Sequence, residues 1–303
     1  MFPHLIGSQR NWFWRGWRIR YTYIRAISVD AQTSLPVVFI HGFGSSLQQW
    51  RSNLQALSQH HTIYAIDLLG FGASEKAATN YSTKLWAEQI YEFWRSFIGQ
   101  PMVLIGHSLG AVVALAAAVA HPEMMAGLVL LTLPPARQEL NSSRLFALAS
   151  TVEGWFANPL LLRPAFWLFR QPRFLKVVLT AAYSDRTYVT NELITSFTAP
   201  TLDRGAAGVF SRLAKARTQA DYTPEIGKLL PQCRSPILVL WGERDRVVPL
   251  TQGKQLPSLN PQLKLVEIPN AGHCLYDECA EQINQMILDW IEDELSLKDY
   301  QYS

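Results

Sequence analysis

The sequence predicts an α/β fold, in which helices cover both faces of a mostly parallel sheet. Short apolar runs recur along the 303 residues, and they are continuous rather than alternating. Continuous runs are typical of parallel strands that are buried on both faces. Helical patterns lie between the runs, and strands that alternate with helices indicate a parallel sheet covered on both sides.

The apolar runs give the strands in chain order. The segment RGWRIRYTYIRAI (15–27) is different, because its polar and apolar residues alternate, and it predicts an antiparallel edge strand or a hairpin. The continuous runs are VVFI (37–40), TIYAID (62–67), MVLIGH (102–107), GLVLLTL (127–133) and ILVLWG (237–242), and LKLVEIP (263–269) is also strand-like.

Two segments show the spacing of an amphipathic helix. In 82–97 the residues Trp86, Ile90, Phe93 and Phe97 fall on one face, and Ser82 is placed to cap the start. In 276–294 the same face is formed by Ile283, Met286, Ile287, Trp290 and Ile291.

One connection is too long for a simple crossover. Roughly a hundred residues separate Leu133 from Ile237, whereas neighbouring parallel strands need only about a dozen. The excess, 136–223, is rich in aromatic residues and prolines and predicts a helical insertion that folds over the rest. We therefore expect a core formed by 1–135 and 224–303, with 136–223 as a cap.

Composition excludes several classes of protein. The apolar share is 49% and the charged share 17%, which argues against disorder, and the net charge is only +3. No stripe of lysines and arginines suggests nucleic-acid binding. The cysteines follow no zinc or redox spacing, so we expect free thiols, no metal and no cofactor. We see no secretion signal or membrane-spanning stretch and expect a cytoplasmic protein.

The segment LIGHSLGA (104–111) predicts a nucleophile. Ser108 follows a predicted buried strand, stands between Gly106 and Gly110, and precedes a run of small helix-forming residues. Glycines at these positions suit a turn too tight for a β-carbon. A strand, a Gly-x-Ser-x-Gly turn and a helix in this order are typical of a nucleophile elbow.

A serine nucleophile needs a base and a carboxylate that orients the base. Among seven histidines we favour His273, because it follows the last predicted strand and the flexible NAG (270–272). His60, His61 and His121 are interpreted as surface residues, and His41 as structural. His107 lies in the elbow but is expected to point away from the serine.

The acid predicted from the sequence is Asp245, which follows ILVLWG, and Glu243 is the alternative. Asp67 also ends a strand, but it opens the loop DLLGFGAS, where a carboxylate is suited to accepting backbone hydrogen bonds. The backbone N–H groups of Phe43, in FIHGFGSS (39–46), and of Leu109 are predicted to stabilise an oxyanion.

On these motifs the chain resembles the α/β-hydrolase superfamily. The matching segments are HGFGSS (41–46), DLLGFGAS (67–74), GHSLG (106–110), GERDRVVP (242–249) and NAGH (270–273). The resemblance implies an eight-stranded, mostly parallel sheet with a helical cap after the sixth strand. Together with WFWRGW (12–17), the loop DLLGFGAS is similar to chlorophyll dephytylase and pheophytinase, which act on the phytyl ester of chlorophyll in photosynthetic organisms.

The function predicted from these features is hydrolysis of a carboxylic ester of a bulky apolar substrate through Ser108, His273, Asp245 and an acyl-enzyme. A chlorophyll or another lipid-like ester fits this class. Two alternatives remain open: a carbon–carbon bond hydrolase with the same triad, and a non-catalytic accessory or receptor protein on the same fold.

Two further segments carry predictions about ligands. The aromatic residues Trp155, Phe166 and Trp167 of the insertion are expected to line a substrate pocket above Ser108. The segment 10–25 combines three tryptophans with five arginines and no acid, which suggests reversible contact with a membrane surface. The alternative for 10–25 is an ordinary edge strand with Trp17, Ile19, Tyr21 and Tyr23 packed inward.

Overall fold

The structure is a computed structural model that describes residues 6–27, 34–140, 159–219 and 221–295. One eight-stranded sheet has the order β1-β2-β4-β3-β5-β6-β7-β8, in which β2 pairs antiparallel with β1 and β4 and the other neighbours are parallel. This confirms the predicted fold class. The strands are β1 (Ser8–Trp14), β2 (Trp17–Ile24), β3 (Val37–Ile40), β4 (Ile63–Ile66), β5 (Met102–His107), β6 (Met125–Leu131), β7 (Ile237–Gly242) and β8 (Leu263–Ile268).

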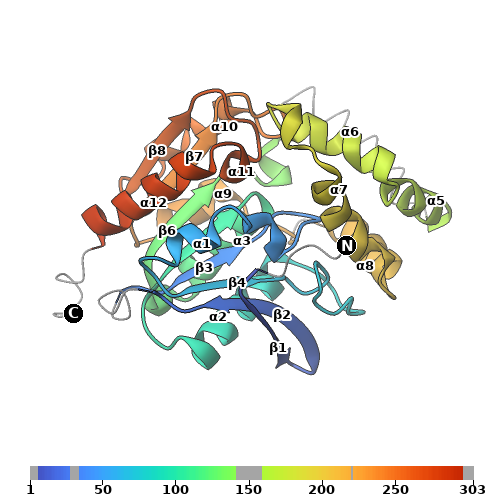
Figure 1. Cartoon of the computed structure of the whole chain (residues 1–303), viewed down its shortest axis with the longest axis horizontal. Coiled ribbons are helices and arrows are strands. Elements are labelled where there is room, and N and C mark those ends of the chain that lie inside the picture. Colours follow the sequence, from blue (N-terminus) through green and yellow to red (C-terminus); the bar gives the residue numbers. More distant parts are fainter. Residues whose placement is uncertain (1–5, 28–33, 141–158, 220, 296–303) are drawn as a thin grey trace.

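Helices lie on both faces of the sheet and between its strands in sequence (Figure 1). The helices are α1 (Leu54–Leu57), α2 (Thr83–Phe97), α3 (Leu109–Ala120), α5 (Pro159–Phe169), α6 (Pro172–Ala182), α7 (Asn191–Thr198), α8 (Ala206–Ala216), α9 (Ile226–Leu229), α10 (Leu250–Gly253), α11 (Leu275–Glu278) and α12 (Ala280–Glu294).

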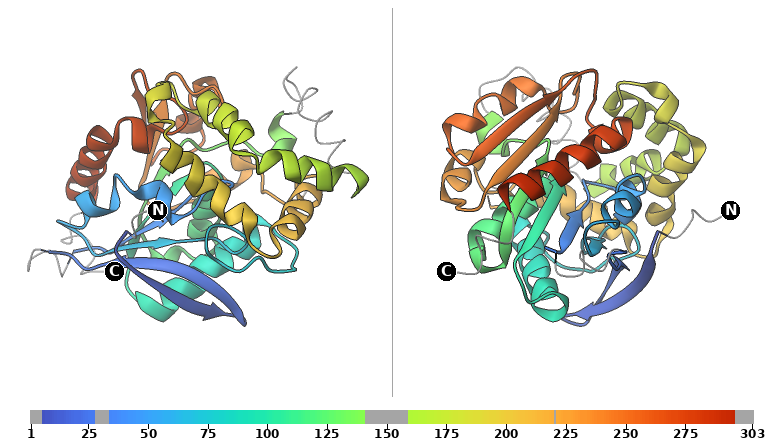
Figure 2. Two further views of the ribbon diagram at one scale, coloured as in Figure 1. Left: turned by 45° about the vertical axis from the view of Figure 1, so that its right-hand side comes forward. Right: turned by 60° about the vertical axis from the view of Figure 1, so that its left-hand side comes forward.

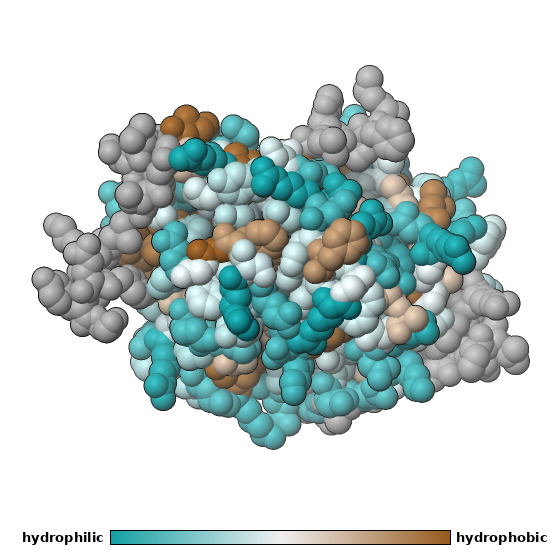
Figure 3. All heavy atoms as spheres, turned by 90° about the horizontal axis from the view of Figure 1, so that it is seen from below, coloured by the Kyte–Doolittle hydropathy of each residue, from teal (hydrophilic) through white to brown (hydrophobic). Residues whose placement is uncertain are grey.

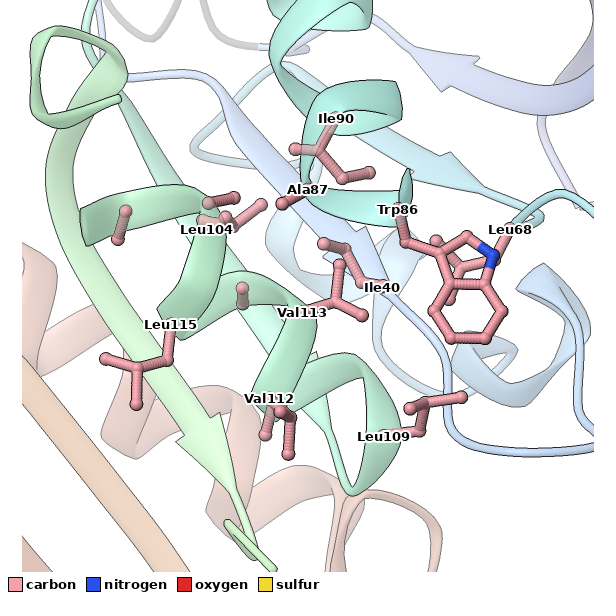
Figure 4. Packing of buried hydrophobic residues seen from close by; sticks show 14 of the residues in the cluster. Ile40, Leu68, Trp86, Ala87, Ile90, Leu104, Leu109, Val112, Val113 and Leu115 are labelled. Carbon is pink, nitrogen blue, oxygen red and sulfur yellow. The ribbon is translucent and has the colours of Figure 1, made fainter. Parts of the chain in front are cut away.

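Alternate residues of the central strands belong to two separate apolar clusters, one on each face of the sheet. Ile40 and Leu104 pack with α2 and α3 on one face, and Figure 4 shows Trp86, Ala87 and Ile90 of α2 beside Val113 of α3. Their neighbours Phe39 and Ile105 pack with α1 and α12 on the other face. This arrangement explains why the strands read as continuous apolar runs, since both faces are covered.

The insertion follows the sixth strand, as predicted. Helices α5 to α8 come between β6 and β7 and form a group on one side of the molecule (Figures 1 and 2). Leu179 of α6 belongs to the cluster of the α12 face, and Val209 of α8 to the cluster of the α2 face. The insertion is therefore anchored to both sides of the core. Its boundaries at 136 and 223 stay a prediction, because 141–158 lie outside the described residues.

The segment 15–27 belongs to a hairpin. β1 and β2 pair through Trp14 and Trp17, and the two turn residues Arg15 and Gly16 have φ of 51° and 84°, the backbone of a tight two-residue turn. Trp14 and Ile19 are buried, and Trp12 contacts the ring of Phe93 in α2 at 5.6 Å.

The surface around this hairpin is mostly polar. The side of the molecule that holds β1 and β2 is largely hydrophilic in Figure 3, with apolar residues in separate patches. Phe13 is the exposed aromatic residue of the turn region, at 70% of its full exposure. Burial of Trp14 and Ile19 supports the inward-packing alternative for the apolar residues of this segment.

The single helix predicted over 276–294 is interrupted. α11 ends at Glu278 and α12 begins at Ala280, because Cys279 between them has a φ of −127° and a ψ of 38°, outside the helical region. The apolar face predicted for the longer part is present, since Ile283, Ile287 and Trp290 are buried. The break leaves the short helix α11 directly behind His273, where it carries two acidic residues.

Candidate active site

Ser108 stands at a strained turn between β5 and α3. Its φ of 53° and ψ of −117° are unusual for a residue with a β-carbon. The turn is also tight: a β-carbon at Gly106 would overlap the carbonyl group of Gly110, and one at Gly110 would overlap the carbonyl oxygen of Ile40. The amide N–H of Ser108 donates to the carbonyl oxygen of Leu131 at 3.0 Å, which ties the elbow to the end of β6.

Asp245 and His273 form a buried pair after β7 and β8. Nδ1 of His273 lies 2.8 Å from Oδ2 of Asp245, and the side chain of Asp245 is fully buried. The other carboxylate oxygen accepts from the amides of Val247 and Val248, each at 2.8 Å. The contact between His273 and Asp245 directs Nδ1 of the imidazole to the carboxylate, so Nε2 is the nitrogen that can take a proton.

Thr132 is a further contact of Asp245 that sequence reasoning missed. Its hydroxyl donates to Oδ2 of Asp245 at 3.2 Å, and its φ is 51°. Thr132 follows β6 directly, so the ends of β6 and β7 are joined at the carboxylate. A polar residue immediately after a buried strand was the available signal.

The structure records no hydrogen bond between the Ser108 hydroxyl and His273, both of which are described. Such contacts are often long in unliganded enzymes and tighten when substrate binds. The backbone of His273 is nevertheless tied to the serine turn, because Nε2 of His107 lies 2.9 Å from the His273 carbonyl oxygen. Burial holds the pKa of His107 well below its usual value, so this imidazole is neutral and its Nε2–H donates.

The two predicted oxyanion donors lie after different strands, Phe43 in the turn after β3 and Leu109 after β5. Leu109 is the first residue of α3, so its N–H has no acceptor within that helix. Phe43 lies in the turn, and the hydrogen bonds of the described residues include none from its N–H. Both donors therefore remain available for a bound oxygen.

The buried side chains of Asp67 and His41 hold the turn after β3. Asp67 accepts the amide of Leu47 at 2.6 Å and that of Ala73 at 2.7 Å, which is the role predicted for it, and burial raises its pKa to about 6. Burial lowers the pKa of His41 to about 4. The neutral ring of His41 contacts the Gly42 carbonyl at 2.7 Å and accepts from Leu68 at 3.1 Å.

The predicted pocket residues are not brought to Ser108 by the described contacts. Phe166 packs against Phe210 of α8 at 5.5 Å, inside the insertion. Trp167 is 58% exposed. Trp155 lies outside the described residues. A pocket formed by these three side chains stays a prediction.

The other histidines and the cysteines differ in burial. His61 is buried, contrary to the prediction of a surface residue, and its Nδ1 lies 3.0 Å from the carbonyl oxygen of Leu35, which gives the buried ring a polar partner. His121 is partly covered by Tyr91, whose ring stacks on it at 3.6 Å. The cysteines Cys233, Cys274 and Cys279 are free. Within the described ranges no three His, Cys, Asp or Glu side chains are grouped so as to hold a metal ion.

A family model described as "alpha/beta hydrolase fold" matches residues 36–279. The match spans well over half of the chain and includes all the segments of the candidate site. The chain therefore belongs to the α/β-hydrolase fold family.

Individual relatives agree with this assignment. The chain is 29% identical over 257 residues to the uncharacterized hydrolase YugF of Bacillus subtilis (strain 168), covering 84% of this chain and 89% of that protein. It is 25% identical over 332 aligned positions to the chloroplastic pheophytinase of Arabidopsis thaliana, covering 91% of this chain and 64% of that one. The family and these names make the chain a hydrolase.

A solved structure shows the same fold. The crystal structure of a membrane phospholipase A superposes with a TM-score of 0.75 at 24% identity, covering 94% of this chain and 86% of that one. In the described part of the present chain, no helix has the length and apolar character needed to cross a membrane.

Proposed function

We propose that this hydrolase cleaves a carboxylic ester of a bulky apolar substrate, with Ser108 as nucleophile, His273 as base and Asp245 as the carboxylate that orients the base. The observation that carries the proposal is the buried contact of 2.8 Å between Asp245 and His273, at the same end of the sheet as the strained Ser108 turn. A serine, a histidine and an aspartate with these roles are recognised by geometry, in whatever order they occur.

The chemistry follows from the contacts. Nε2 of His273 accepts the hydroxyl proton as Ser108 attacks the ester carbonyl, and Asp245 stabilises the imidazolium that forms. The amides of Phe43 and Leu109 donate to the oxyanion of the tetrahedral intermediate. The imidazolium then protonates the leaving alcohol, and water, deprotonated by the same imidazole, releases the acid from Ser108.

The insertion supports an apolar substrate. Its helices carry Phe166, Phe169, Phe174 and Phe210, whose rings contact one another at 4.8 to 5.5 Å. The described contacts place these rings inside the insertion. The proposal is that the apolar insertion also covers the substrate, since sites for small apolar ligands are lined mainly by apolar groups. The relation to a pheophytinase supports a chlorophyll ester or another lipid-like ester within this class.

The test combines a covalent label with an ester panel. Fluorophosphonate should label the wild-type protein and leave Ser108→Ala unlabelled, and hydrolysis of p-nitrophenyl esters should fall by about 10⁵–10⁶-fold in the variant. Equal labelling of both proteins would reject Ser108 as nucleophile. A labelled protein that cleaves a vinylogous diketone and no ester would favour the carbon–carbon hydrolase instead.

A further inference from the structure

Resting on the proposed function, we infer that Glu278 is a positioning residue for His273. Its carboxylate joins the loop that carries the base to residues 182–185 of the insertion. The base then adopts its working position only when the insertion is seated on the core.

The peptide of His273 is held by two parts of the molecule. Its N–H donates to the carbonyl oxygen of Ala182, the last residue of α6, at 2.8 Å. Its carbonyl oxygen accepts from His107 of β5. The peptide of His273 is thus hydrogen-bonded both to the serine turn and to the insertion, two segments that are far apart in the sequence.

Glu278 reinforces the side that faces the insertion. Oε1 accepts from the amide of Gly272, the residue before the base, at 3.0 Å. Oε2 accepts from the amide of Ser184 at 2.8 Å, from that of Asp185 at 3.3 Å and from the Ser184 hydroxyl. One carboxylate therefore bridges the base loop and the insertion.

The two segments are in direct contact at this bridge. A β-carbon on Gly272 would lie 2.7 Å from the Ser184 amide nitrogen and 2.8 Å from the Ala182 carbonyl oxygen. The Ser184 hydroxyl also contacts the carbonyl oxygen of Asn270 at 2.6 Å. Backbone packed this closely has little room to relax, so a shift of α6 would be passed to the loop of His273.

The bridge requires an acceptor at both ends. A carboxylate accepts on both oxygens, whereas an amide places donors on one of its two arms. In Glu278→Gln an NH₂ group would face either the Gly272 amide or the Ser184 and Asp185 amides. The substitution keeps the size of the side chain but breaks one side of the bridge.

The experiment compares Glu278→Gln with Glu281→Gln, which removes a nearby exposed carboxylate of α12. Misplacing a catalytic group by about 1 Å can cost about 10²-fold. We expect the kcat of Glu278→Gln and its rate of fluorophosphonate labelling to fall about 10- to 100-fold, with KM changed less than about threefold, and Glu281→Gln to match wild type. Ser184→Ala, which loses only the hydroxyl contacts, should show a smaller loss in the same direction.

A purely structural role would lower the unfolding temperature while leaving kcat unchanged in assays well below that temperature. Such a result, or equal kcat for both Gln variants, overturns the inference. If Glu278→Gln does not fold, Ser184→Ala decides: unchanged kcat rejects the inference and a reduced kcat supports it. Wild-type protein that takes no label at Ser108 rejects the proposed function itself, a result distinct from a labelled wild type with an unaffected Glu278→Gln.

Discussion

The serine turn and the histidine loop reach the same site by different physical means. The serine turn is fixed by steric exclusion, because glycines at 106 and 110 allow backbone groups to touch and leave no space for a β-carbon. The loop of His273 is fixed by hydrogen bonds to Asp245, His107, Ala182 and, through Gly272, Glu278. The contacts that fix the serine turn lie within the core, whereas the loop of His273 also depends on partners in the insertion.

Because of this difference, the two segments should respond differently when the insertion moves. The proposed nucleophile, Ser108, is held within the core and should keep its position whatever the state of the insertion. The proposed base, His273, is held partly by the insertion, so its position depends on how the insertion is seated on the core. Substitution of the glycines in the serine turn should therefore act mainly on fold stability, and substitution of the groups that bond the histidine loop should act mainly on turnover.

Among the variants that test this comparison, the largest expected effect comes from Asp245→Asn. The variant would place an amide where His273 needs an acceptor and would leave the imidazole in the wrong tautomer, for a loss of about 10⁴-fold in kcat. Steady-state ester hydrolysis measures this, and circular dichroism should show an intact fold. If activity stays near that of wild type, Glu243 becomes the alternative acid.

Gly110→Ala tests the steric half of the comparison. The added methyl group would overlap the carbonyl oxygen of Ile40, so we expect destabilisation of about 3 kcal/mol, the upper end for overpacking. Denaturant unfolding measures the free energy. Gly99→Ala is not a suitable control because its φ is 67°. Ala116→Gly in the same helix as Gly110 provides one, with an expected loss of about 1 kcal/mol.

The buried carboxylate of Asp67 predicts a pH dependence of stability. Burial raises its pKa from 3.8 to about 6 in the folded protein, so between about pH 4 and 6 the folded state binds more protons than the unfolded state. The contribution of Asp67 is therefore fully favourable below pH 4 and is lost as the pH rises through about 6. The unfolding free energy of wild type minus that of Asp67→Asn should fall over this window and stay constant above it. A difference that rises with pH would contradict this account.

The smallest effect concerns the hairpin of β1 and β2, which lies outside both the serine turn and the histidine loop. The membrane-surface contact proposed for residues 10–25 would use exposed groups such as Phe13 and Arg18, since Trp14 is buried. Each basic group near an anionic surface contributes about 1 kcal/mol. Phe13→Ser with Arg18→Gln should weaken co-sedimentation with anionic vesicles at low salt and leave kcat unchanged. Equal sedimentation of wild type and the double variant would contradict membrane contact and leave the hairpin as an ordinary edge of the sheet.

The sequence was most informative where burial decides the structure. Continuous apolar runs located β3 to β7, because strands covered on both faces leave a signal in composition alone. Spacing does not give the order of strands, so the position of β3 between β4 and β5 had to come from the structure. The break at Cys279 was missed because the apolar spacing of 276–294 continues on both sides of it.

The candidate site was predictable to the extent that its residues follow strand ends. Ser108 and Asp245 each come after a buried strand, and His273 follows the partly exposed strand β8, all three in a recognisable motif. The contacts of Thr132 and Glu278 were not predictable, since each joins segments far apart in the chain. His61 was misplaced for a related reason: its acceptor is a backbone carbonyl, which any residue at position 35 would supply.

The bridge at Glu278 also limits how this chain could be recombined. An insertion between two strands can be exchanged as a unit when its two ends match the core, and 136–223 is such an insertion. The replacement would in addition have to return a backbone carbonyl to the amide of His273 and two amides to Glu278, as residues 182–185 do. Donor segments that lack this short stretch should yield folded but poorly active chimeras, and restoring it should recover turnover without any change at the site of chemistry.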